Sequence, residues 1–281
     1  MFLFFGNNKG SNKQKIIEKE VGKGMKFIRL TTITVLSTTI LAGGAIPAFA
    51  EEVREVTTNG QIEFTPNSEE EVEVIPPVVD PEVDIDPEVP GTVGPLSIVK
   101  AVTMNFGSQV ISNKDLTYNM VAEMANLKDG SGQVPYVSFA QVQDLRGSNV
   151  GWELQVSLSN FTSNTRNNVL TGAEIKFLNP SIQYEGDNAE NAPVAHEAEL
   201  KLIPEKGAVP VMTAADGKGA GASSVIWGDQ TNLNTQFADD EIKVVENDGI
   251  QLSIPGSTAK DATTYTATLT WELTTTPGED A

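Results

Sequence analysis

Two Trp-Glu-Leu triplets hold the side chains best suited to binding chemistry. The first is Trp152, Glu153 and Leu154, and the second is Trp271, Glu272 and Leu273. An indole ring has a flat face for stacking and a single N–H donor. This chemistry is recognition rather than catalysis, so the candidate binding residues are Trp152, Leu154, Trp271 and Leu273.

Both triplets lie in segments with the two-residue period of a β-strand. Apolar and polar residues alternate over 152–158 and again over 264–274. Each Trp and Leu therefore share one strand face, and each Glu points to the other. We expect the triplets to lie close together and to act as a unit, although core packing or a partner-protein interface would produce the same alternation. The third tryptophan, Trp227, follows an apolar run and is expected in the core.

Other catalytic or metal-binding groups are scarce. The chain has no cysteine and one histidine, His196, which we expect to be an exposed loop residue. Acidic groups cluster at 187–191 and 239–241, but neither run has the spacing of a calcium loop, so both are interpreted as solvated faces. The sequence therefore predicts a protein that is not an enzyme and that has no cofactor and no metal site.

The composition is strongly acidic. The 281 residues include 19 Lys and Arg against 38 Asp and Glu. Nucleic acid is an unfavourable partner, because phosphate binding requires a basic surface.

Residues 1–50 have the features of an export signal. A basic start at 25–29 precedes an uncharged apolar stretch and the small residues Ala48 and Ala50. This pattern predicts a signal peptide cleaved after Ala50. Residues 19–21 can be encoded by a ribosome-binding sequence just ahead of Met25, so we expect Met25 to be the true start and 1–24 to be a translated leader. A membrane anchor is the alternative, but the apolar span is barely long enough. After cleavage we expect no membrane association.

Residues 51–95 form an acidic, proline-rich segment. They contain 13 Asp and Glu, one Arg and seven Pro. Such a composition predicts a disordered, extended spacer, or alternatively a solubilising tail.

Residues 96–281 contain short apolar segments separated by turn signals, which predicts an all-β, sandwich-like domain. The expected strands are 96–104, 134–142, 152–159, 173–178, 198–203, 223–227, 250–254 and 263–275.

The two triplets, the sequence Asp-Leu-Arg-Gly at 144–147, the opening at 94–98 and the final alternating run together resemble the WxL domain of Gram-positive surface proteins. The resemblance covers 94–281. It implies non-covalent attachment to the cell wall through peptidoglycan, and partners among surface proteins of the same gene cluster. The middle residue of the triplet varies in that family, so Glu153 and Glu272 carry no special information.

Non-covalent attachment agrees with two further observations. The sequence has no Leu-Pro-x-Thr-Gly motif and no cysteine to be lipidated. We therefore expect a secreted protein of the cell wall or cell surface that binds peptidoglycan. The alternative is an extracellular adhesin or surface-complex subunit that binds a partner protein through the same domain, and a wall-hydrolysing enzyme ranks third.

Overall fold

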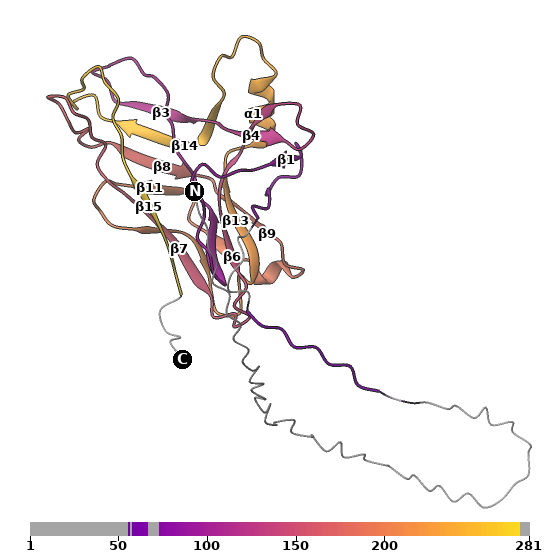
Figure 1. Cartoon of the computed structure of the whole chain (residues 1–281). Helices are drawn as coiled ribbons and strands as arrows, with labels where there is room; N and C mark the ends of the chain where they lie inside the picture. Colours follow the sequence, from indigo (N-terminus) through magenta and orange to yellow (C-terminus); the bar gives the residue numbers. More distant parts are fainter. Residues whose placement is uncertain (1–55, 57, 67–72, 276–281) are drawn as a thin grey trace, which may run out of the picture. The chain divides into compact units, whose positions relative to one another are not determined.

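The computed structural model describes Val56, 58–66 and 73–275. The predicted leader and signal peptide, 1–50, lie outside these residues. Contacts divide the chain into two units, 1–59 and 60–281, and the second contains every strand and helix considered below (Figure 1). Of the described helices, none is long and apolar enough to cross a membrane.

The fold is all-β, as predicted, and consists of small antiparallel sheets. The sheet that contains both triplets has the order β10-β12-β7-β15. Its strands are β10 (Val194–Ala195), β12 (Val209–Ala214), β7 (Trp152–Leu158) and β15 (Leu269–Thr274). β15 is thus the last strand of this sheet, next to β7.

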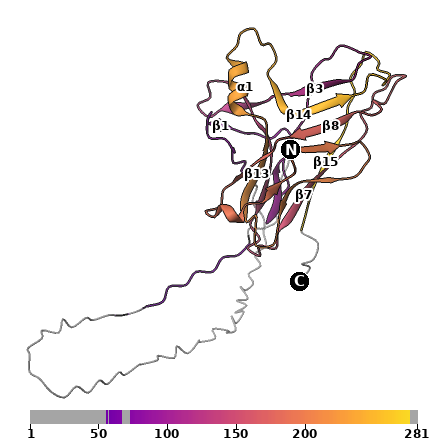
Figure 2. The ribbon, with the colours of Figure 1, turned by 180° about the vertical axis from the view of Figure 1, so that it is seen from behind.

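Two further sheets of four strands accompany it (Figures 1 and 2). One has the order β11-β8-β14-β3, with bounds Glu199–Leu202, Glu174–Leu178, Glu246–Ile254 and Leu116–Val121. The other has the order β2-β6-β13-β9, with bounds Leu96–Lys100, Ser138–Asp144, Gly221–Trp227 and Ser181–Tyr184.

A smaller sheet has the order β1-β4-β5. Its strands are β1 (Val83–Asp84), β4 (Glu123–Leu127) and β5 (Gln133–Tyr136). The described residues also contain one α-helix, α1 (Gln230–Phe237), and one 3₁₀ turn, Ala189–Asn191. The N-cap of α1 is Asp229, whose carboxylate accepts a hydrogen bond from the Asn232 N–H at 2.9 Å.

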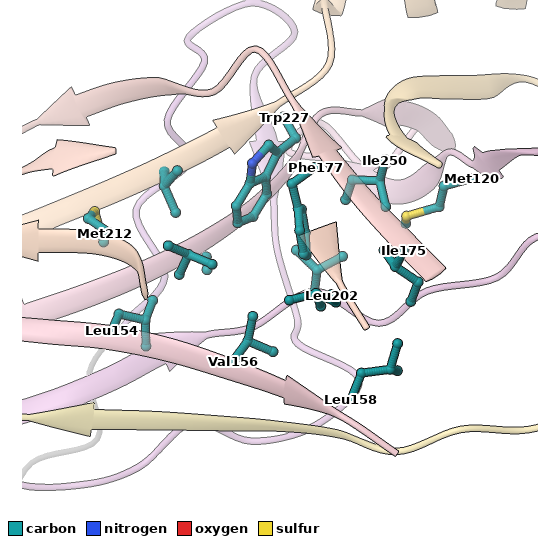
Figure 3. Close-up of a cluster of buried hydrophobic side chains, with 14 of the residues drawn as sticks. Met120, Leu154, Val156, Leu158, Ile175, Phe177, Leu202, Met212, Trp227 and Ile250 are labelled. Atoms are coloured by element: carbon teal, nitrogen blue, oxygen red, sulfur yellow. The ribbon is translucent and has the colours of Figure 1, made fainter. Parts of the chain in front are cut away.

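Strands β6 and β13 separate two hydrophobic clusters. Ala140 and Val142 face the main core, together with Trp227. The alternate residues Phe139 and Ile226 face a second, smaller core. Both faces of these strands are covered, which explains why they are buried almost throughout. Figure 3 shows side chains of the main core, where Leu154 and Val156 of β7 lie among residues of the other strands.

The predicted boundary between spacer and domain at residue 95 is wrong. Val83 is buried in the second core, and Val74, Val78 and Ile85 pack against that core. Strand β1 pairs with β4. The acidic composition is compatible with docking because Glu82 and Asp84 are exposed while Val83, between them, is buried. The described residues from 73 onward therefore belong to the β-domain.

Two backbone-to-side-chain clamps hold this docked segment. The Tyr136 hydroxyl donates to Val78 O at 2.6 Å and accepts from Val78 N–H at 2.8 Å. The Gln141 amide likewise bonds both backbone groups of Ile75, at 2.7 and 2.9 Å. Residues 58–66 are exposed and form no helix or strand, and 51–55, 57 and 67–72 of the predicted spacer lie outside the described residues.

Candidate functional site

The two triplets are brought together, as predicted. Strand β15 pairs antiparallel with β7, with Leu273 opposite Leu154 and Trp271 opposite Val156. We call these two strands the β7–β15 ribbon. The tryptophans are not direct neighbours, because the register places Leu opposite Leu and leaves each Trp toward a different end of the ribbon.

An ion pair between buried Asp144 and partly buried Arg146 fixes the start of β7. The Asp144 carboxylate accepts from Arg146 Nε at 2.9 Å and Nη2 at 2.7 Å, and Nη2 also donates to Gly151 O at 2.8 Å. The hydrogen bond to Asp144 raises the pKa of Arg146. The Asp-Leu-Arg-Gly sequence thus positions the residue that immediately precedes Trp152.

Trp152 and Leu154 are fully buried, each with an exposed fraction of 0 %. The indole N–H of Trp152 donates to Gly219 O at 3.0 Å. A Cβ at Gly219 would lie 2.6 Å from that indole nitrogen, so glycine is required for this close approach. These two candidate residues have no surface with which to stack on a ligand in this structure.

Trp271 and Leu273 have a different environment. Both are partly buried on β15 and pack against the main core. The Trp271 ring centroid lies 6.4 Å from that of Trp227 and 6.5 Å from that of Phe177. Trp227 is fully buried, as predicted. Trp271 is therefore the accessible edge of an aromatic cluster whose interior is Trp227 and Phe177, with ring centroids 4.5 Å apart. Figure 3 shows these two interior side chains next to each other.

His196 is not the exposed loop residue that we predicted. Its ring stacks on Trp227 at 6.1 Å, and its Nε2 accepts a hydrogen bond from the Trp227 indole N–H at 2.8 Å. Its Nδ1–H donates to Glu197 O at 2.5 Å. Burial lowers the pKa of His196, and the bond to Glu197 opposes that change. The His196 ring packs inward, while its neighbours Val194 and Glu197 stay exposed, because the indole N–H of Trp227 in the core needs an acceptor. The local sequence does not reveal this requirement.

The other face of the ribbon is polar. Glu153, Gln155 and Ser157 of β7 lie beside exposed Thr270, Glu272 and Thr274 of β15. Gln155 Nε2 donates to Glu153, and the Thr213 hydroxyl donates to the other Glu153 oxygen at 3.4 Å.

Hydroxyl, amide and carboxylate groups in such a row are suited to hydrogen bonds with sugar hydroxyls or peptide groups. The family resemblance gives Glu153 and Glu272 no special role, because the middle residue of the triplet varies. Strand alternation alone nevertheless places both side chains on this polar face.

The two acidic runs, 187–191 and 239–241, form turns that their own side chains stabilise. Asn188 caps the 3₁₀ turn by accepting from Glu190 N–H at 3.0 Å, and Asp239 accepts from Glu241 N–H at 3.0 Å. Among the residues that the structure describes, no group of three or more His, Asp or Glu side chains is arranged to hold a metal ion.

These features define a β-domain with an aromatic edge and a polar sheet face, as expected of a surface-binding module. A family model described as a WxL domain, surface cell wall-binding, matches residues 51–277. The chain belongs to the WxL family and is a cell-surface protein with a cell wall-binding domain. The match starts at residue 51 and so includes the docked acidic segment. No curated protein and no solved structure matches the chain.

Proposed function

We propose that this protein is secreted through the signal peptide at 25–50 and attaches non-covalently to the peptidoglycan of a Gram-positive cell wall. The observation that carries the proposal is the family match over 51–277. The site supports it, because the last strand of the sheet presents a partly exposed indole on one face and a row of hydroxyl and carboxylate groups on the other, and both are suited to glycan and peptide recognition. The role is binding, without catalysis.

We assign the contact to the β15 side of the ribbon. Trp271 would stack on a ligand that lies along the β15 edge of the sheet. Thr270, Glu272 and Thr274, whose side chains point to the opposite face of the strand, would hydrogen-bond to the part of the ligand that reaches that face. Trp152 and Leu154 would act indirectly, because their burial holds β7 in place for β15 to pair with. Of the four predicted site residues, Trp271 would touch the wall, Leu273 would anchor β15 to the main core, and Trp152 and Leu154 would position β7.

The test is co-sedimentation of the purified chain with peptidoglycan stripped of proteins and of anionic polymers. The proposal predicts saturable retention in the pellet and no soluble muropeptides in the supernatant. Absence of retention would contradict direct wall binding, and release of muropeptides would contradict a purely binding role.

A second candidate function is that of an adhesin or surface-complex subunit that binds a partner protein. The observation in its favour is the position of β15 as the last strand of its sheet, since such a strand has backbone N–H and C=O groups to which another chain can add a strand. This candidate predicts no retention on bare peptidoglycan, and retention once a surface protein from the same gene cluster is present.

A further inference from the structure

A short strand-like sequence in the segment 58–66 has no partner among the residues that the structure describes. In the run 61–65, Gln-Ile-Glu-Phe-Thr, apolar and polar residues alternate, and Pro66 ends the run. Ile62 and Phe64 are 76 % and 83 % exposed. Isoleucine, phenylalanine and threonine are residue types that favour strands. The run therefore has the pattern of a strand with one apolar face, and that face is open to solvent.

The run differs in composition from the rest of the acidic segment. Residues 58–66 contain one acidic side chain, whereas 67–73 contain four. The family match begins at residue 51 and includes both stretches. Dense like charge keeps a chain solvated, so 61–65 has the composition of a strand that pairs rather than of a spacer.

Strand β15 offers a free edge of suitable length. It is the last strand of its sheet, and among the described strands it pairs only with β7. The backbone N–H and C=O groups on its outer side are therefore available to another strand. β15 has six residues, so a strand formed by 61–65 can pair along nearly its whole length.

The other outermost strands of the four-stranded sheets are less suitable. β10 has two residues, and β9 and β11 have four each. At the edge of β2, Thr92 N–H donates to Ile98 O, and at the edge of β3, Val121 N–H donates to Asn105 O. Both of these edges are thus partly occupied by neighbouring backbone, which leaves β15 as the long free edge.

The side chains of the two strands match in type. One face of β15 has a partly exposed apolar row and the other an exposed polar row. A strand that is added with Ile62 and Phe64 beside Trp271 covers the exposed part of the apolar row, and its own polar residues then continue the polar row. Pairs of aromatic residues, and of aromatic and β-branched residues, stabilise neighbouring strands.

A single molecule leaves both surfaces unused. Residues 60–66 belong to the same contact unit as the β-domain, yet they remain exposed, and the described part of the chain forms no strand on the outer side of β15. A second copy carries the same run and the same edge, so each surface finds its complement in another molecule.

We propose that residues 61–65 of one molecule add as a strand to the β15 edge of a second copy of this chain. The donor run and the acceptor edge are different surfaces, so the contact is heterologous and extends head to tail. The inference does not rest on wall binding, because it depends only on the free backbone edge and the exposed run.

Charge sets the conditions for this association. Each chain has a formal net charge of −19, so two copies repel each other. Salt screens this repulsion, whereas burial of Ile62 and Phe64 does not depend on it. Association should therefore strengthen as the salt concentration rises.

The first experiment is sedimentation velocity of the purified chain over a wide range of protein and salt concentrations. We expect the weight-average mass to rise with protein concentration, and to rise more at high salt. A monomer under all conditions would overturn the proposal, and would also be the result if 61–65 paired with β15 of its own chain.

The matched variants each replace two exposed apolar residues of the acidic segment. Ile62→Thr with Phe64→Thr keeps the strand propensity but removes apolar area, so association should weaken at least about tenfold. Val89→Thr with Val93→Thr is the control, since both valines are 67 % exposed and lie outside the run, and it should associate like wild type. Unchanged association of the first variant would overturn the proposal. Its retention on peptidoglycan should stay unchanged, which separates this test from that of wall binding.

The second experiment locates the acceptor edge. A synthetic peptide with the sequence of 58–66 is titrated into the ¹⁵N-labelled chain that carries Ile62→Thr and Phe64→Thr. We expect saturable shifts of the amides of 269–274. A peptide with threonine at both apolar positions should bind at least about tenfold more weakly. Shifts confined to other strands, or no binding of the wild-type peptide, would overturn the proposal.

Discussion

The three tryptophans differ in what surrounds their indole N–H groups. Trp152 donates to a backbone carbonyl and Trp227 to a histidine, and both are fully buried. Trp271 is partly buried, and within the described residues its indole N–H forms no hydrogen bond. At the scale of single residues, the Trp-x-Leu motif thus has two physical roles, because one copy completes the core and the other reaches the surface.

Substitution by phenylalanine separates these roles. Trp271→Phe shrinks the stacking face while keeping most of the apolar volume, so we expect weaker retention on peptidoglycan with little change in the free energy of unfolding. Trp152→Phe removes the hydrogen bond to Gly219 and leaves that carbonyl unpaired, so we expect a loss of about 1–3 kcal/mol in that free energy with retention unchanged at temperatures where the variant is folded. Chemical denaturation and co-sedimentation measure the two effects.

The opposite result for Trp271→Phe, a folded protein that is retained like wild type, would place the wall contact elsewhere.

His196 predicts a pH dependence of stability. Burial lowers the pKa of His196 in the folded protein. Near and below pH 6.5, the imidazole of the unfolded chain therefore binds a proton more readily than that of the folded protein. The contribution of His196 is fully present above its ordinary pKa and is lost as the pH falls toward the folded value. We expect the free energy of unfolding to fall between pH 7.5 and 5.5, and to fall less in His196→Gln, whose side chain has no proton to gain. Identical pH profiles would contradict this prediction.

At the scale of elements, the alternation of apolar and polar residues identified β7 and β15, because each of these strands has one core-facing side and one more solvent-exposed side. The same reasoning placed strands near β2, β6, β8, β11, β13 and β14. It missed β1, β3, β4, β9, β10 and β12. In β3 the apolar residues Leu116, Tyr118 and Met120 alternate with polar ones, so this strand could have been predicted, whereas Pro210 interrupts the apolar pattern of β12. It also missed the docking of 73–95, because composition records the abundance of Pro and carboxylates, whereas docking depends on where Val78 and Val83 meet a second core that the sequence does not reveal.

The docked segment makes a prediction about Tyr136. Burial raises the pKa of Tyr136 to about 12, so one tyrosine should ionise well above the ordinary value of about 10 in an ultraviolet pH titration. Tyr136→Phe should remove that late transition, cost about 1 kcal/mol of stability and accelerate hydrogen exchange at Val78. Tyr184→Phe on β9 is the control, and the late transition should persist in it. Its persistence in Tyr136→Phe would contradict the assignment.

At the scale of the whole molecule, charge opposes attachment to an anionic wall. The full chain has a formal net charge of −19 at pH 7, and removal of 1–50 would make it more acidic. Repulsion over a Debye length of about 8 Å at physiological salt weakens as ions are added or carboxylates are protonated. Retention on intact walls should therefore improve at higher salt, and at pH 4–5 as long as the domain stays folded. Weaker retention under both changes would mean that attraction depends on ionised carboxylates, for example through divalent cations.

The central claim is that peptidoglycan contacts the β15 side of the ribbon. The three indole N–H resonances report on it directly, because the chain has only three tryptophans. Titration of the ¹⁵N-labelled protein with soluble peptidoglycan fragments should shift the Trp271 indole and the amides of 270–274, while the indoles of Trp152 and Trp227 stay nearly unchanged. Saturable shifts confined to other strands, with the Trp271 resonance unmoved, would contradict the account.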